Sequence, residues 1–201
     1  MTHAREATRC LVAASAALLA ACGGGTTSVD TGLSRSALLA LARFDSAGPS
    51  SPASCVFHNN QLFTCSITHS DSVHTLFASI KFTPHSIVSR SDTLLCDSCT
   101  IVVTVALTPG SYQLDVGPAS LVFNQSGEPV ATVSFERYGD PSVYTQSSRY
   151  ASAAAYEQAV ELWRERTPDH WVEARNSSHS GQFAITSALE GPGSYLVAAV
   201  K

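Results

Sequence analysis

Cysteines carry most of the reactive chemistry of this 201-residue chain, at positions 10, 22, 55, 65, 96 and 99. The run Cys96-Asp97-Ser98-Cys99 has the spacing of a zinc ligand pair, of a redox-active dithiol and of a locally closed disulfide. No second CxxC and no HxxxH follows at zinc-finger spacing, which disfavours a metal site. A thioredoxin-like site would need a helix after the motif, whereas Thr100–Leu107 (TIVVTVAL) is typical of a strand.

The first 21 residues have the three parts of a secretory signal: Arg5 and Arg9, a short apolar run, and small residues at its end. The run is too short to span a bilayer core, which takes about 20 residues. A plain cleaved signal with Cys22 as a free thiol is one interpretation. Leu19-Ala20-Ala21-Cys22 resembles the lipobox of bacterial lipoproteins, and this resemblance implies that Cys22 becomes a lipidated N-terminus.

Four cysteines remain downstream, and the secretory signal assigns them to an oxidising compartment. Three pairings are possible. A hairpin centred on Asn60 would place Cys55 opposite Cys65, and Cys96 can close locally on Cys99. We therefore predict the disulfides 55–65 and 96–99.

No recognisable catalytic motif accompanies these cysteines. The chain lacks a G-x-S-x-G elbow, an H-E-x-x-H helix, a P-loop and a G-x-G-x-x-G turn. Six scattered histidines favour surface positions, although His69 and His74 could meet across a bend to hold a metal. Trp163 and Trp171 could form a sugar-stacking platform, but as hairpin partners they are more typical of a core. We expect no catalytic residue, no metal and no cofactor.

Charge excludes one class of partner. Loss of Arg5, Arg9 and Glu6 with the leader changes the formal net charge from −4 to −5. This mild acidity argues against nucleic acid as a partner, because nucleic-acid binding would require a clustered basic face. After cleavage the chain is still long enough for one domain with a substantial core.

The residue pattern predicts a tether followed by strands. Residues 22–54 are expected to be a flexible linker containing a short helix or edge strand over Ser34–Phe44, and the ordered domain is expected over 55–201. Alternation of apolar and polar residues predicts strands at Cys55–His58 and Leu62–Thr68 (paired as a hairpin), Val73–Phe82, Thr100–Leu107, Tyr112–Val116, Leu121–Phe123, Val130–Tyr138, His170–Arg175, Gln182–Ala188 and Tyr195–Val200. Ser148–Arg166 has helical composition.

From Leu76 onward the pattern resembles the β-sandwich domain shared by the spectrin-binding part of ankyrins, the cytoplasmic part of netrin receptors and many bacterial envelope proteins (the ZU-type domain). The residues that carry the resemblance are Tyr112-Gln113-Leu114-Asp115-Val116-Gly117-Pro118, Leu121-Val122-Phe123, Glu128-Pro129-Val130 with Val133-Ser134-Phe135, Trp171-Val172, and Gly193-Ser194-Tyr195-Leu196-Val197. These motifs are loose, but their order and spacing agree over about 120 residues of the chain.

This resemblance implies two further expectations. Ala159–Glu165 should be a strand paired with the Trp171 strand, so we predict a helix near Ser148–Gln158 followed by a strand. Some relatives cleave themselves at a His-Phe-Ser site in the last loop. Here Gly193 precedes Ser194, so self-cleavage is not expected.

These observations predict an all-β, immunoglobulin-like antiparallel β-sandwich with one short helix and a flexible N-terminal tether. The expected function is a non-catalytic, lipid-anchored envelope module with a binding or structural role. It would be held to the membrane by lipid on Cys22, with an envelope protein or glycan as partner. The alternative is a small periplasmic hydrolase or carbohydrate-active enzyme. Gly23 stands where lipoproteins retained in the inner membrane carry Asp, which favours the periplasmic face of a Gram-negative outer membrane.

Overall fold

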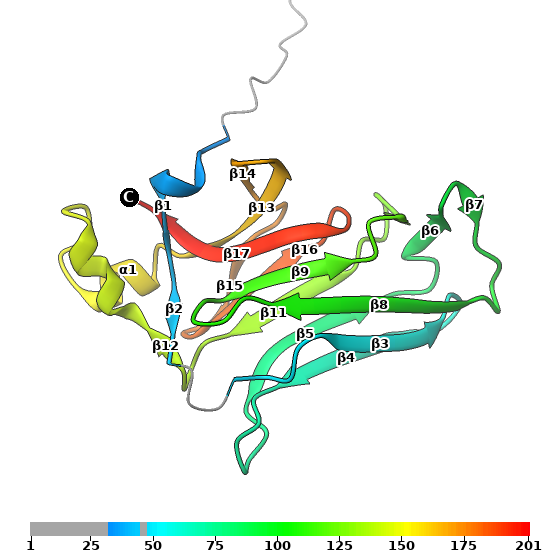
Figure 1. The fold of residues 1–201 in the computed structure, drawn as a ribbon, viewed down its shortest axis with the longest axis horizontal. Coiled ribbons are helices and arrows are strands. Elements are labelled where there is room, and N and C mark those ends of the chain that lie inside the picture. Colours follow the sequence, from blue (N-terminus) through cyan, green and yellow to red (C-terminus); the bar gives the residue numbers. More distant parts are fainter. Residues whose placement is uncertain (1–31, 45–47) are drawn as a thin grey trace, which may run out of the picture.

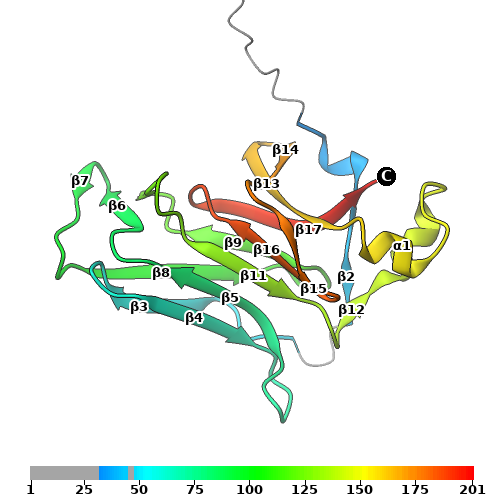
Figure 2. The same cartoon turned by 180° about the vertical axis from the view of Figure 1, so that it is seen from behind.

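Two antiparallel sheets face each other across an apolar core in the computed structural model of the protein, which describes residues 32–44 and 48–201 (Figure 1). The larger sheet lies in front in Figure 1 and the smaller one in Figure 2. The larger sheet contains, in spatial order, β14 (His170–Glu173), β13 (Glu161–Thr167), β17 (Gly193–Val200), β9 (Gln113–Gly117), β8 (Thr100–Leu107) and β3 (Ala53–His58), with β1 (Leu38–Ala40) also paired to β17.

The second sheet has five strands, and smaller elements close the ends of the sandwich. The five strands are, in spatial order, β15 (Ser178–Gly181), β16 (Ala184–Ala188), β11 (Val130–Ser134), β5 (Leu76–Phe82) and β4 (Phe63–Thr68). The smaller elements are the sheet of β10 (Leu121–Phe123), β6 (Ile87–Arg90) and β7 (Thr93–Leu94), the pair β12 (Gly139–Asp140) and β2 (Ala42–Arg43), the 3-10 turns η1 (Arg35–Ala37) and η2 (Pro141–Gln146), and the helix α1 (Ala153–Glu157). The predicted all-β antiparallel sandwich is confirmed.

Alternating residues build the core between the two sheets. In β8, Ile101, Val103 and Val105 are buried while the residues between them face outward. β11 does the same with Ala131 and Val133. Because side chains in a strand alternate between its two faces, each sheet presents an apolar face to the core. The outer face of the five-stranded sheet is polar, whereas the outer face of the larger sheet also carries a second apolar cluster around Trp163 and Trp171. Burial of that inward face is the main favourable term in the stability of the sandwich.

The predicted hairpin of Cys55–His58 with Leu62–Thr68 is wrong. Consecutive strands β3 and β4 belong to different sheets, because β3 pairs with β8 and β4 with β5. Phe57 of β3 stacks between the sheets on Phe63 and Phe82, with ring centroids 5.2 and 4.5 Å away. The chain therefore arches from one sheet to the other.

Because of this arch, the predicted disulfide Cys55–Cys65 connects the two sheets instead of two strands of one hairpin. The two Cα atoms are 5.6 Å apart, within the range of a disulfide, and both side chains are buried. Cys55 lies opposite Val103 in one sheet, and Cys65 lies opposite Ile80 in the other. The bond thus joins two edge strands across the core.

Part of the segment expected to be linker belongs to the sandwich. β1 pairs with β17, with Leu38 opposite Val200, and Leu33 forms a bridge with Trp171. Leu38 and Leu41 are almost fully buried, which explains why this short apolar run is ordered. Of the two expected alternatives, a short helix or an edge strand, the strand is found: the segment contains the 3-10 turn η1 and the two short strands β1 and β2. Residues 1–31, including the predicted leader and the anchor Cys22, lie outside the described residues.

The expectation of a helix followed by a strand in the ambiguous region is confirmed by α1 and β13. Ser152 begins α1 as its N-cap, with Oγ accepting a hydrogen bond from the Ala155 amide at 3.1 Å. The strand β13 is covered on both faces: Leu162 packs in the main core, and Trp163 packs on the opposite side. This two-sided burial overrides the helical propensity of the residues. No helix in the described ranges is long and apolar enough to cross a membrane.

Asp71 closes the connection between β4 and β5. Its carboxylate accepts hydrogen bonds from the amide of Thr75 at 2.8 Å, the hydroxyl of Thr75 and the hydroxyl of Tyr138 at 2.9 Å. The hydrogen bond from the Thr75 hydroxyl contributes most to lowering the pKa of Asp71 to about 2. The ionised carboxylate is therefore the form that holds this turn to Tyr138.

Replacement of both Cys55 and Cys65 by Ala should lower the free energy of unfolding by about 3 kcal/mol, because the disulfide restricts the unfolded chain. Chemical denaturation of the oxidised proteins measures the change. The matched control is the Cys96→Ala/Cys99→Ala protein, whose much shorter loop predicts a smaller loss. An equal or larger loss in the control would contradict a dominant role for the inter-sheet bond.

Asp71→Asn should change the acid limb of stability. The folded-state pKa of Asp71 is depressed, so its contribution is complete above the unfolded value of about 3.9 and is lost as the pH falls towards 2. The variant should be less stable at neutral pH and should lose less stability than the wild type between about pH 4 and 2. Thermal unfolding across this range tests it, with the exposed turn residue replaced in Asp92→Asn as control. Parallel profiles for Asp71→Asn and wild type would refute the assignment.

Candidate functional site

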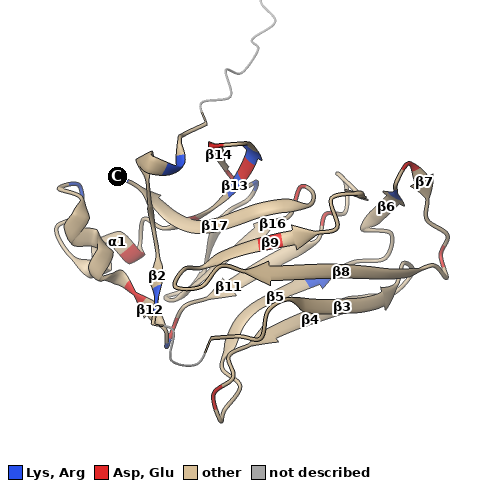
Figure 3. Ribbon diagram, in the orientation of Figure 1, with Lys and Arg blue, Asp and Glu red and all other residues tan. Residues whose placement is uncertain are grey.

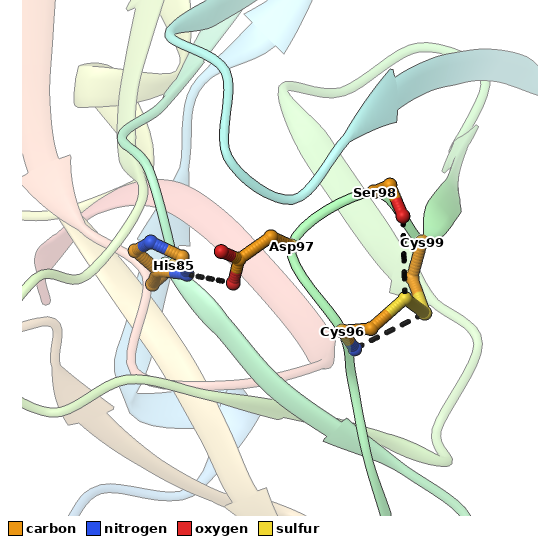
Figure 4. Close-up of a disulfide and its surroundings, with 5 residues drawn as sticks. All are labelled: His85, Cys96, Asp97, Ser98 and Cys99. Carbon is orange, nitrogen blue, oxygen red and sulfur yellow. Dashed lines mark hydrogen bonds and ion pairs between the residues drawn. A yellow bond between two sulfur atoms is a disulfide. The ribbon is translucent and has the colours of Figure 1, made fainter.

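The second predicted cysteine pair lies in an exposed loop between β7 and β8. The Cα atoms of Cys96 and Cys99 are 5.0 Å apart, within disulfide range, and the Cys96 amide donates to Cys99 Sγ at 3.1 Å (Figure 4). Asp97 Oδ1 is 3.7 Å from His85 Nδ1, and both side chains are more than half exposed. The two cysteine pairs therefore differ in access: one is sealed between the sheets, and the other is open to solvent.

Backbone hydrogen bonds connect this loop to the β3–β4 arch. The amide of Asn59 donates to the carbonyl of Cys99 at 3.2 Å, and the amide of Asn60 donates to that of Asp97 at 3.1 Å. The amide of His85 donates in turn to the carbonyl of Asn59 at 2.7 Å. These hydrogen bonds fix the loop that carries Cys96 and Cys99 against the β3–β4 arch at the tip of the sandwich.

The histidines and tryptophans considered in the sequence analysis do not come together in a binding site. His69 is buried and stacks on Tyr138 with ring centroids 4.1 Å apart, whereas His74 is exposed. No group of three or more metal-binding side chains occurs among residues 32–44 and 48–201. Trp163 and Trp171 are at most 8% exposed and pack with Leu38, so they offer no ligand platform.

The outer face of the five-stranded sheet has a regular chemistry that sequence reasoning missed. One row of directly opposed residues crosses all five strands, and every member bears a hydroxyl: Ser178, Thr186, Thr132, Ser79 and Ser66. We call this set the hydroxyl row. Thr132 Oγ1 and Thr186 Oγ1, at its centre, are hydrogen-bonded at 3.0 Å. The hydroxyl row is uncharged, and its side chains can both donate and accept hydrogen bonds.

Charged side chains are sparse on this sheet. Of the residues in its five described strands, only Lys81 is an Asp, Glu, Lys or Arg. Figure 3 shows that most acidic and basic residues lie in turns, in loops and around β13 and β14. The exposed face consequently lacks the dense basic cluster that a polyanion would require.

Two cavities flank the hydroxyl row along β11 and β16. The first has a volume of about 440 Å³ and lies beside Val130 and Ala188. The second has a volume of about 320 Å³ and lies beside Ser134 and Ala184. Between them stands the Thr132–Thr186 pair. We call this stretch, from one cavity through the threonine pair to the other, the β11–β16 track.

A fixed ion pair lines the first cavity. Arg175 Nε donates to Glu128 Oε2 at 3.1 Å, Arg175 Nη2 also contacts Glu128 Oε1, and Nη2 donates to the carbonyl of Gln125 at 3.2 Å. The Glu128 side chain is only 7% exposed, so it is held in place rather than freely solvated. Gln125 and Asn176 add amide side chains to the same lining.

A sequence signal for this face exists, but it is local to each strand. Thr64, Ser66 and Thr68 alternate with buried residues in β4, and Thr132 and Ser134 do so in β11. Alternation identifies outward residues within one strand. It cannot say which strands are neighbours or in what register, and the hydroxyl row depends on both.

Comparisons of the chain with protein-family models, with curated proteins and with solved structures gave no match. The assignment of a functional surface therefore rests on geometry and chemistry alone.

Limited reduction should separate the two cysteine pairs. A low concentration of thiol reductant followed by alkylation should label Cys96 and Cys99 well before Cys55 and Cys65, because thiolate attack requires access to sulfur. Mass spectrometry of peptides from the folded protein measures the order. Fully denatured protein is the control, in which burial no longer protects either pair. Simultaneous labelling in the folded protein would contradict this difference.

Proposed function

We propose that the protein is a lipid-anchored, non-catalytic binding module of the bacterial envelope. The lipobox-like run ending at Cys22 supports the anchor. The outer face of the five-stranded sheet supports the binding role and is the single observation that carries it. This face is broad, hydroxyl-rich and flanked by two cavities, on a scaffold whose opposite face is packed in the core.

The position of the first described residues supports a tethered arrangement. Leu33 and Trp171 exchange two backbone hydrogen bonds, at 2.7 and 2.8 Å, on the edge strand β14 of the larger sheet. The eleven residues 22–32 can span at most about 40 Å when fully extended. A domain held this way would stay within that distance of the membrane, and its five-stranded sheet would not be the attachment point.

Location follows from the same sequence features. Gly23 after the lipidated cysteine favours the periplasmic face of the outer membrane. Membership of the ZU-type sandwich family belongs to this proposal as well: the antiparallel sandwich and the strand at β13 support it, and they leave the activity open because one fold hosts many functions.

Palmitate labelling of cells that produce the full-length protein tests the anchor. Wild type should incorporate the label and sediment with membranes, whereas Cys22→Ala should be unlabelled and released into the periplasmic fraction. Cys10→Ala is the control, since Cys10 lies in the leader and its loss should leave labelling intact. Label that persists in Cys22→Ala would overturn the lipoprotein assignment.

Crosslinking in intact cells tests the binding role. An anchored module should capture one abundant envelope component. The Cys22→Ala variant should capture less of the same component. Absence of any crosslinked component with both forms would contradict it.

A further inference from the structure

We propose that the β11–β16 track is a binding site for a neutral glycan chain. The inference rests on the proposed binding role of the protein and names the chemical class of its ligand.

The backbone of the track excludes a peptide that would bind by adding a strand. β11 pairs with β5 on one side and with β16 on the other, and β16 pairs with β11 and β15. Strand addition requires an edge with free amides and carbonyls, and both of these strands are interior. Along the strands between the two cavities, a ligand is therefore recognised by side chains.

The side chains of the track match sugar hydroxyls. A sugar hydroxyl donates and accepts hydrogen bonds, and so do the hydroxyls of Thr132, Thr186 and Ser134 and the amides of Gln125 and Asn176. The chemistry is therefore reciprocal along the whole track, from the amides in the first cavity through the threonine pair to Ser134 at the second. The small apolar residues Val130 and Ala184, both partly exposed, provide surface for the C–H faces of sugar rings.

Charge selects a neutral chain over an anionic one. Arg175 is compensated by Glu128, with which it makes a hydrogen bond and an ion pair. Glu136 places a carboxylate beside the second cavity. The ion pair leaves no net charge at the first cavity, and Glu136 adds a negative charge at the second, so an anionic ligand gains no net attraction along the track. A neutral polyol can accept a hydrogen bond from the half-exposed Arg175 guanidinium and donate one to the Glu136 carboxylate.

The dimensions suit a short run of sugars. Val130 and Ser134 are four residues apart in β11, which corresponds to about 13 Å along a strand. The cavities of about 440 and 320 Å³ extend the track beyond both residues. The Arg175–Glu128 pair holds the first end before any ligand arrives, so little side-chain ordering is needed there on binding.

Titration of the full-length protein with chitohexaose, cellohexaose and maltohexaose tests the proposal, in a detergent without a sugar headgroup and with affinity measured by calorimetry. At least one hexasaccharide should bind. Thr132→Val removes a hydroxyl at the centre and should weaken binding about fivefold, as expected for one lost hydrogen bond. Asn176→Gly should weaken it at the first cavity, and glycine suits the positive φ of 58° at this position.

Thr64→Val is the matched control. It makes the same substitution on the same face, but on the edge strand β4, away from the track, and it should leave affinity unchanged. Thermal unfolding establishes that each variant is folded. Failure of all three hexasaccharides to bind, or equal affinity for wild type, Thr132→Val and Asn176→Gly, would overturn the site.

The two proposals can fail separately. Capture of an envelope protein by crosslinking, together with no binding of any hexasaccharide, would overturn the glycan site and leave the anchored module standing. Hexasaccharide binding that depends on Thr132, in a protein that carries no lipid at Cys22, would support the site and overturn the anchor.

Discussion

The pairing of the C-terminal strand β17 is the interaction on which the larger sheet depends. One edge of β17 bonds to β13, and the other edge bonds first to β9 and then to β1. Its side chains are needed on both faces: Tyr195 and Val197 enter the main core, while Leu196 and Ala198 pack with the two tryptophans. Without this strand, β1 would have no partner strand, β13 would keep only β14, and the two tryptophans would lose their contacts with Leu196 and Ala198.

The predictable parts of the fold were those specified by local alternation. The β-branched run Thr100–Leu107 is a strand with the expected bounds, and the alternating run predicted over Val130–Tyr138 is a strand over Val130–Ser134. The partner of each strand is a long-range property. Cys55 and Cys65 point inward whether their strands pair in one sheet or face each other across two, so cysteine spacing predicted the bond but not the arch. The candidate site escaped prediction for the same reason, since its row of hydroxyls exists only once five strands are in register.

The backbone amides and carbonyls of β11 and β16 are already paired with neighbouring strands, and this limits how the proposed site can bind a ligand. An interior pair of strands has no free amides or carbonyls to offer, so any selectivity must come from the side chains that stand above the sheet. The hydroxyls of Thr132 and Thr186 already form a hydrogen bond with each other, and a ligand would replace that hydrogen bond with one of its own. Because one hydroxyl contact is exchanged for another, the net gain in free energy from binding at this pair is small.

The antiparallel pairing of β1 with β17 has a mechanical consequence. Leu38, the first residue of β1, lies opposite Val200 near the end of the chain, and β1 is the strand nearest to the anchor in sequence. Tension applied from the membrane would reach the bridge between Leu33 and Trp171 first and the pair of β1 with β17 next. The first residues to lose cover would be Trp163 and Trp171, while the disulfide between the two sheets would hold the rest of the sandwich closed.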